Sequence, residues 1–134
     1  MNKQEMKTYL EKNNFSKRLK YLNKITDNKK IVIYGSGLFF QTIYENYDLS
    51  KLNIIGLSDK KFLFNKYDED VLGYKCYSIH EVEDLKPDFI LVCILDPLNV
   101  IYDLKNVIFK DKNITILPMV KKSFWGLIKE VYKL

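Results

Sequence analysis

The residues of this sequence whose types and spacing could bind a ligand are two glycines and a carboxylate downstream of them. Gly35-Ser36-Gly37 directly follows the apolar run 30–34, and Asp59 comes 24 positions after Gly35. Glycine at 35 permits a tight turn, and glycine at 37 lets the backbone approach a phosphate closely. An acidic side chain near this spacing holds the two hydroxyls of a ribose in dinucleotide-binding proteins. The pattern therefore predicts a nucleotide site.

Two predicted strands and one predicted helix must position these residues. The run 30–34 is rich in β-branched and aromatic residues, as a buried parallel strand requires, and 53–58 is a second such strand. Apolar residues at helical spacing over 38–47 predict a helix that begins at Leu38. The free N–H groups of this helix and the positive end of its dipole would point at the phosphate.

The third position of the glycine motif departs from the dinucleotide pattern. A small residue is usual there because helix and strand pack closely, but this sequence has Phe40. We expect the ring to push the helix outward or to fill space beside the turn, and we expect NAD to bind less tightly as a result. Methyltransferases that bind S-adenosylmethionine have the same order of strand, glycine turn, helix and acid. The pattern alone does not separate these ligands.

Three more strands are predicted after Asp59, at residues 74–77, 89–94 and 113–117. Residues 60–73 have no clean period and are interpreted as a loop with one helical turn. The strand 89–94 is entirely apolar, which requires helices on both faces of the sheet. The predicted fold is α/β, a Rossmann-like three-layer sandwich with a five-stranded, mostly parallel sheet in the order 3-2-1-4-5.

Two helices are predicted in the second half of the chain. Ser78 and Glu81 form a capping-box pair that begins a helix over 79–85, and a later helix runs from Pro97 to about residue 109. Asp96 precedes that later helix and is interpreted as its cap. In the predicted strand order, Asp96 also lies beside the glycine turn, in the crevice where such sheets bind ligands. A ligand contact is therefore the alternative role of Asp96.

The predicted ligand contacts come from the glycine turn, the start of the helix after it and the two strand ends: Gly35, Ser36, Gly37, Leu38, Asp59, Lys60 and Asp96. For Asp59, the alternative to a ribose contact is a turn or helix cap beside Lys60 and Lys61. No set of catalytic residues is identifiable in the sequence.

Amphipathic segments are predicted at both ends of the chain. Residues 3–26 form one or two helices, interrupted at Asn13-Asn14, with Ser16 as the cap of the second. Residues 121–134 carry a large apolar face that something must cover. The N-terminal helix, a second subunit and an acidic membrane surface are the expected covers, in that order. The terminal helices are thus the predicted contacts with a second copy or with a partner protein.

Composition narrows the classes of function. The 134 residues are expected to form one domain, with an N-terminal helical extension at 1–28, a core at 29–118 and a C-terminal helix at 119–134. The formal charge of +5 comes from lysines that are dispersed along the chain. Nucleic-acid-binding proteins concentrate their basic residues on one face, so we expect no nucleic-acid partner.

Cysteine and histidine usage gives no sign of metal or redox chemistry. Cys76 and Cys93 lie in predicted strands, in neither a CxxC motif nor a Cys/His cluster, and the single histidine is His80, so the cysteines are interpreted as buried thiols in a reducing cytosol. His80 is interpreted as an exposed residue with no catalytic role. The chain has neither an apolar run of transmembrane length nor the apolar core of a signal peptide, so we expect a cytoplasmic protein with no transmembrane segment.

One resemblance extends the prediction. The segments IVIYGSG, IIGLSDKK, GYKCYS, HEVEDL and KPDFILVCI follow one another between residues 31 and 94. In this order they resemble Rossmann-like modules of bacterial surface-glycan enzymes, namely the N-terminal domain of sugar acyltransferases and the C-terminal domain of sugar C-methyltransferases. The resemblance covers about two thirds of the chain.

The acyltransferase domain holds a nucleotide-sugar substrate rather than a redox cofactor. The resemblance thus implies that Gly35, Ser36 and Gly37 lie at the phosphates or sugar and that Asp59 lies toward the nucleoside. Phe40 departs from the family pattern, and no left-handed β-helix repeat follows, so no acyltransferase active site is expected.

Three functions follow from these observations. The first is an accessory nucleotide- or nucleotide-sugar-binding module, without catalysis, in bacterial surface polysaccharide biosynthesis, for which the resemblance implies a partner glycan enzyme at the terminal helices. The second is an NAD(P)-dependent sugar-modifying enzyme or subunit, for which the sequence has no Tyr-x-x-x-Lys arrangement at the required place. The third is a vestigial Rossmann fold that acts in protein association, which Phe40 favours.

Overall fold

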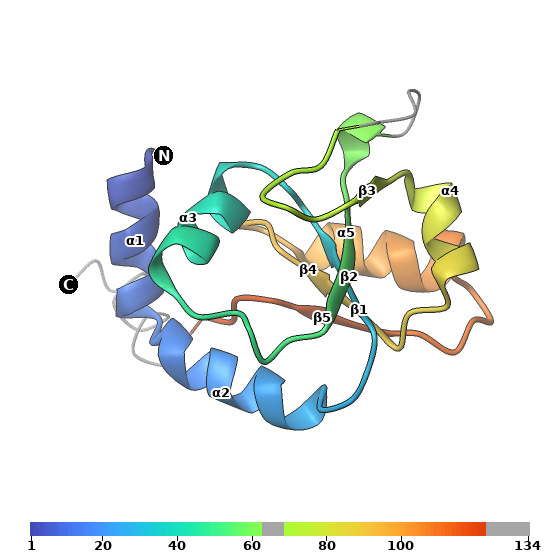
Figure 1. Ribbon diagram of the computed structural model, residues 1–134, viewed down its shortest axis with the longest axis horizontal. Coiled ribbons are helices and arrows are strands. Elements are labelled where there is room, and N and C mark those ends of the chain that lie inside the picture. The colour runs from blue at the N-terminus through green and yellow to red at the C-terminus, as the bar shows by residue number, and fades with distance from the viewer. Residues whose placement is uncertain (63–68, 123–134) are drawn as a thin grey trace.

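The computed structural model describes residues 1–62 and 69–122 and contains a five-stranded sheet (Figure 1). The strands lie in the order β3-β2-β1-β4-β5, and each neighbouring pair is parallel. The α/β fold predicted from the sequence, with strand order 3-2-1-4-5, is confirmed. The strands are β1 Ile31–Tyr34, β2 Ile54–Ser58, β3 Cys76–Tyr77, β4 Phe89–Val92 and β5 Thr115–Pro118.

Helices follow the strands as the sequence predicts, and the capping box of α4 is present. Ser78 Oγ accepts a hydrogen bond from Glu81 N, and Glu81 Oε1 accepts one from Ser78 N. A π-helical turn, Leu104–Ile108, extends the last described helix. The α-helices are α1 Lys3–Lys12, α2 Phe15–Ile25, α3 Leu38–Asn46, α4 Ile79–Val82 and α5 Leu98–Asp103.

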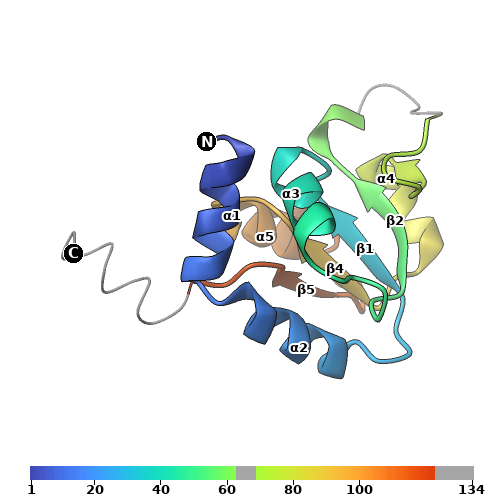
Figure 2. The same ribbon diagram turned by 60° about the vertical axis from the view of Figure 1, so that its left-hand side comes forward.

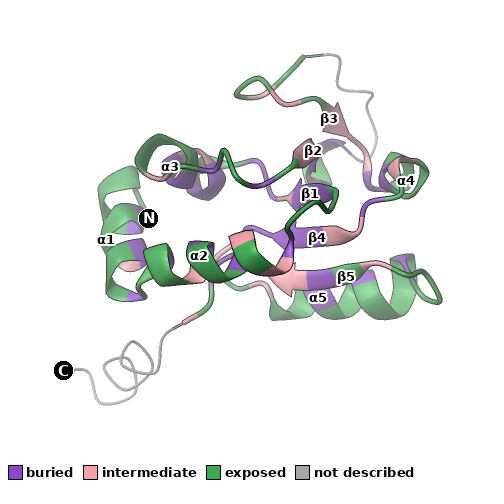
Figure 3. Ribbon diagram, turned by 60° about the horizontal axis from the view of Figure 1, so that its bottom comes forward, coloured by how far each residue is buried: buried purple, intermediate pink, exposed green. Residues whose placement is uncertain are grey.

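Apolar clusters fill both faces of the sheet. In β1, Ile33 packs in one cluster with residues of α1, α2 and α3, whereas Val32 packs in the other with residues of α4 and α5. β4 divides in the same way, with Leu91 in the first cluster and Ile90 in the second. Figure 3 shows the buried residues of these strands in the middle of the fold. The helices on both faces explain why β4 is apolar along its whole length.

The N-terminal helices pack on the sheet within the same chain. Figure 2 shows α1 beside α3, and the Lys3 ammonium forms an ion pair with Glu45 of α3 at 2.7 Å. The Tyr9 ring of α1 meets the Phe39 ring edge to face, with 6.1 Å between centroids. Buried residues of both N-terminal helices belong to the same apolar cluster as Ile33 of β1.

The break between α1 and α2 falls at Asn13-Asn14, as predicted, but Ser16 does not cap α2. Asn14 precedes α2 and has the left-handed φ of 49°, with no side-chain cap bond. Asparagine tolerates this conformation, so the helix begins at Phe15, before Ser16 can occupy the cap position. The prediction for Ser16 was wrong.

Two further predictions near the end of β4 were wrong. The strand ends at Val92, so Cys93 lies just outside it, although its N–H still donates to Tyr34 O of β1 at 2.7 Å, and the chain bends over the next residues, 94–96. Asp96 does not cap α5, because the half-helical residue before the helix is Pro97. Asp96 is therefore one residue too early to reach the first N–H groups of the helix.

Phe40 fills space beside the glycine turn, which is one of the two outcomes expected for its ring. The side chain is fully buried and meets the Tyr74 ring edge to face at 6.1 Å between centroids. Tyr74 belongs to the short bridged turn Val71–Tyr74 before β3. The aromatic contact therefore links the first turn of α3 to the segment that leads into β3.

The remaining predictions concern the loop and the C-terminal segment. Lys60–Phe62 forms one 3-10 turn, as expected for the start of the loop 60–73, and residues 63–68 lie outside the described part. Of the amphipathic segment predicted at 121–134, the structure describes residues 121 and 122. The predictions about its helix and its cover fall outside the described residues.

Candidate functional site

Gly35 is fixed by its contacts with the protein itself. Its φ of +112° is a left-handed conformation, and a Cβ built on it would lie 2.5 Å from the carbonyl oxygen of Cys93. Its N–H donates to Ser58 O at 2.8 Å. The positive φ and the close Cys93 carbonyl require glycine at this position, and the bond to Ser58 holds its backbone in place. The residue serves the turn between β1 and α3 whether or not a ligand is present.

Gly37, unlike Gly35, is not restricted by contacts with the rest of the protein. It is exposed, and a Cβ built on it would meet no atom within 4 Å. It is also the residue from which α3 begins, and no side chain caps that helix. The first N–H groups of an α-helix have no partner within the helix, and the helix dipole makes this end positive. The open backbone at Gly37 and the uncapped start of α3 at Leu38 can therefore receive an anion.

Asp59 is bonded to the glycine turn. One carboxylate oxygen, Oδ2, accepts hydrogen bonds from Ser36 N at 2.8 Å and Ser36 Oγ at 3.0 Å. The other, Oδ1, accepts from Lys61 N at 3.3 Å, which is the turn-capping contact considered in the sequence analysis. A carboxylate offers about four acceptor positions, so these three bonds leave capacity for a ligand hydroxyl. Lys60 follows Asp59 and is exposed.

Tyr34, at the end of β1, joins this side of the site and was missed in the sequence analysis. Partial burial raises the pKa of the Tyr34 hydroxyl, and the nearby charge of Asp59 raises it further. Ser58 pairs with Tyr34 across β1 and β2 and is fully buried, with no described hydrogen-bond partner for its Oγ. The signal that could have identified Tyr34 is its position as the last strand residue before the turn.

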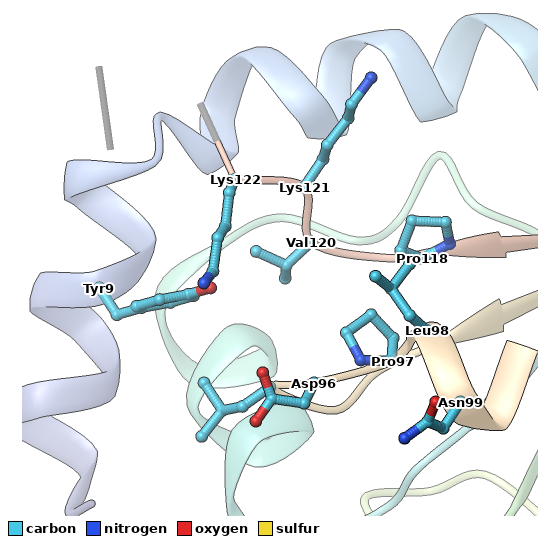
Figure 4. Close-up of a pocket in the computed structure, with 10 residues that line it drawn as sticks. Tyr9, Asp96, Pro97, Leu98, Asn99, Pro118, Val120, Lys121 and Lys122 are labelled. Atoms are coloured by element: carbon cyan, nitrogen blue, oxygen red, sulfur yellow. The ribbon is translucent and has the colours of Figure 1, made fainter. Parts of the chain in front are cut away.

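A cavity of about 550 Å³ lies at the carboxyl ends of β4 and β5, a size typical of small-ligand sites. Figure 4 shows Tyr9, Asp96 and Lys122 entering this space from three separate segments. The walls are mostly apolar and include Leu95 and Val120. The other lining residues are Pro97, Leu98, Asn99, Pro118 and Lys121.

The cavity and the glycine turn share two walls. The segment after β4 touches both, because Ile94 lies against Gly35 and the next residues, Leu95 and Asp96, line the cavity. On the other side, Tyr9 lines the cavity and its ring contacts Phe39 in the first turn of α3. The anion-accepting start of α3 is therefore adjacent to the cavity.

The structure divides the predicted contacts into two groups. Gly35, Ser36 and Asp59 are bonded to one another or to the same strand ends, with Gly37, Leu38 and Lys60 beside them. Asp96 belongs to the cavity instead, together with Tyr9, Lys121 and Lys122, which were not predicted. Tyr9 precedes Asp96 by 87 positions, and no local pattern connects them.

The two cysteines adjoin the glycine turn without bonding to it through their thiols, because the Cys93 carbonyl packs against Gly35 and Cys76 lies within electrostatic range of Asp59. Cys93 is fully buried, and burial raises the pKa of its thiol well above the ordinary range, so it stays protonated. Burial also raises the pKa of the partly buried Cys76 thiol. His80 is exposed on α4. None of these residues lines the cavity or bonds to the glycine turn.

Within residues 1–62 and 69–122, no group of three or more His, Cys, Asp or Glu side chains could hold a metal ion. The described helices include none that is both long enough and apolar enough to cross a membrane. Comparison of the chain with protein-family models, with curated proteins and with solved structures gave no match.

Proposed function

We propose that this chain binds a nucleotide or nucleotide sugar at the carboxyl edge of its sheet and acts as an accessory module without catalysis of its own. The observation that carries the proposal is the uncapped start of α3 at an open glycine, at the carboxyl end of β1, where the strand order reverses between β1 and β4. The resemblance of the sequence to modules of bacterial surface-glycan enzymes supports the same ligand class.

Charge and space at the edge support this ligand. The start of α3 suits phosphate groups, and Asp59 has acceptor capacity left for a ribose hydroxyl. The adjacent cavity has the size of a small-ligand site. Burial raises the pKa of both thiols, which disfavours a reactive thiolate, so the polar groups at the edge favour binding over covalent chemistry.

A thermal-shift screen with NAD, NADP, S-adenosylmethionine, CMP and UDP-, GDP- and CDP-linked sugars tests the proposal. A ligand that binds only the folded state raises the melting temperature. We expect a shift with one class of nucleotide and none in Gly37→Val, which places a branched side chain where the phosphate would approach. Gly37→Val should still fold, because its Cβ enters open space.

The matched control is Ser78→Val, which places the same side chain at the cap of α4, away from the cavity lining and the glycine turn. It should lower the melting temperature through the lost cap and leave the ligand shift intact. Absence of a shift with every compound at millimolar concentration would refute nucleotide binding. An unchanged shift in Gly37→Val would remove the turn from the site.

A second candidate, protein association, is favoured by the outer surface of α5 and its π-helical extension. Leu98, Tyr102 and Val107 are 76%, 65% and 69% exposed there. Large exposed apolar side chains that gather on one element are typical of protein contacts. Light scattering over a range of concentrations, with Tyr102→Ser as the variant, separates this candidate from a monomeric binding module.

A further inference from the structure

We propose that the outer face of α2, together with Lys121 beside it, docks on an anionic lipid surface. The inference goes beyond the proposed function, since it concerns a surface apart from the glycine turn and does not depend on nucleotide binding. It is carried by the position of the excess positive charge, by the lack of acidic partners for that charge, and by the chemistry of the chain that follows Lys122.

The excess positive charge of the chain lies in its first 30 residues. Nine of the 22 basic residues and three of the 17 acidic residues fall within residues 1–30. This part therefore has a formal charge of +6, whereas the rest of the chain has a formal charge of −1. The lysines occur along the whole sequence, but the net charge belongs to α1, α2 and the link to β1.

α2 carries its lysines as one stripe on the solvent side. Lys17, Lys20 and Lys24 are exposed and are spaced by three and four positions, so they share one face of the helix. The opposite face packs in the apolar cluster with β1, and Figure 3 shows exposed residues along the outer side of α2. α2 contains no acidic residue, and none of these lysines forms an ion pair within residues 1–62 and 69–122. Their charge is therefore available to a partner.

A fourth lysine joins the stripe from the end of the sheet. Arg18 of α2 donates hydrogen bonds to the carbonyl oxygens of Pro118 and Met119, so the chain after β5 runs beside α2. Lys121 follows Met119 by two residues, which places its Cα within about 7 Å of the Met119 Cα. The Lys121 side chain is exposed, and Figure 4 shows it extending away from Asp96. Basic side chains from two distant parts of the chain thus meet on one side of the molecule.

The kind of basic residue favours lipid over nucleic acid. Arginine recognises phosphates and bases through a planar guanidinium that donates two parallel hydrogen bonds, whereas lysine acts as a compact charge on a flexible stem. Arg18 is the single arginine of the sequence, and its guanidinium is engaged by the carbonyls of Pro118 and Met119. The stripe therefore offers lysines, which suit the diffuse negative potential of an anionic headgroup layer.

Aromatic side chains add an apolar contribution at the same surface. Tyr21 lies among the lysines of α2 and is 50% exposed, with the Arg18 guanidinium 5.4 Å from the centroid of its ring. The sequence after Lys122, beyond the described residues, contains Trp125 and further apolar residues. Tyrosine and tryptophan are enriched at membrane–water interfaces, and binding strengthens when apolar contact and electrostatic attraction act together. An anionic lipid surface, one of the covers expected for residues 121–134, supplies both.

Co-sedimentation of the full chain with lipid vesicles tests the inference. We expect vesicles of equal parts phosphatidylcholine and phosphatidylserine to bind the protein more tightly than vesicles of phosphatidylcholine alone. Salt at ~1 M, where the Debye length is about 3 Å, should remove this preference. One lysine near an anionic surface contributes roughly fivefold to affinity, so Lys20→Glu, which changes the charge by two, should weaken binding about 25-fold.

Lys105→Glu is the matched control, because it makes the same change of net charge at an exposed helical lysine on the opposite face of the sheet. It should leave vesicle binding nearly unchanged. Circular dichroism should show that Lys20→Glu folds normally, since Lys20 is exposed and has no described partner.

Equal binding to both kinds of vesicle would overturn the inference. An effect of Lys105→Glu as large as that of Lys20→Glu would do the same, because net charge rather than the face of α2 would then control binding. Tighter binding to duplex DNA or single-stranded RNA than to the anionic vesicles, at the same salt concentration, would replace the lipid surface with nucleic acid. None of these results changes the outcome of the thermal-shift screen for nucleotides.

Discussion

The carboxyl ends of the strands form one edge of the sheet, and the polar groups in the two halves of this edge are bonded in different ways. On the side of β1 and β2, Asp59 bonds to Ser36, and the backbone at Gly35 packs against Cys93. On the side of β4 and β5, Asp96 lines a cavity and has no described partner. The carboxylate of the first half is bonded into the fold, whereas that of the second is exposed and lines a cavity. The same residue type thus stabilises the turn in one half and forms part of a cavity wall in the other.

The largest difference in stability is expected between alanine variants of the two glycines of the turn. Gly35→Ala places a Cβ against the Cys93 carbonyl at a left-handed φ, so it should lower the free energy of unfolding by about 3–5 kcal/mol. Gly37→Ala points into open space and should cost less than about 1 kcal/mol. Urea unfolding of both variants, followed by circular dichroism, measures the difference.

Equal losses in the two variants would show that both glycines serve the fold, and the turn would then be closed along its whole length. A small loss in Gly35→Ala would mean that the chain after β4 can move away from the turn. Either result contradicts the division of the edge described above.

A smaller difference in stability is expected between alanine variants of the two carboxylates, Asp59 and Asp96. Asp59→Ala removes the acceptor from Ser36 N and Ser36 Oγ and should cost about 1–3 kcal/mol of stability. Asp96→Ala breaks no described contact and should change stability by less than about 0.5 kcal/mol. The same urea titrations compare them at neutral pH. A destabilising effect of Asp96→Ala as large as that of Asp59→Ala would place Asp96 in the structure rather than in a ligand site.

The smallest effect concerns the ionisation of Tyr34. Burial, and then the charge of Asp59, raises the pKa of Tyr34 above its ordinary value of 10.0. A neutral Tyr34 therefore contributes stability that is fully present below about pH 10 and is lost as the pH rises through the raised pKa. Asp59→Asn should lower this pKa while leaving it above the ordinary value, because burial remains the larger cause.

Carbon NMR of labelled tyrosine rings follows this ionisation, with Tyr34→Phe to assign the signal. Asp96→Asn is the control, since Asp96 is not among the causes of the raised pKa. A Tyr34 pKa that stays unchanged in Asp59→Asn would show that burial alone sets it.

Most of the fold could be predicted from local patterns. Apolar runs between turn residues identify strands, and the capping box Ser78–Glu81 identifies the start of α4. The glycine turn was predictable for the same reason, since its residues are neighbours in the sequence. Asp59 was located by its spacing, although its bonds to Ser36 N and Oγ depend on how the turn folds.

The errors and omissions share a physical cause. Caps depend on where a helix begins to within one residue, so Ser16 and Asp96 were assigned to positions that Asn14 and Pro97 occupy. The cavity was not predicted because its walls come from α1, the segment after β4 and the segment after β5. Contacts between such distant segments leave no periodic signal in the sequence. Tyr9 in particular has the pattern of an ordinary amphipathic helix residue.

Contacts in this fold differ widely in the number of residues that separate their partners, which determines when each contact can form during translation. The guanidinium of Arg18 in α2 donates hydrogen bonds to the carbonyl oxygens of Pro118 and Met119, 100 and 101 positions later. The bonds between Ser36 and Asp59 span only 23 positions. When β1 and β2 have left the ribosome, both Ser36 and Asp59 have been synthesised. At that stage the residues at the end of β5 that bond to α2 have not. The contact between Ser36 and Asp59 is therefore local in sequence, whereas the contacts of α2 with the chain after β5 are among the longest-range in the fold.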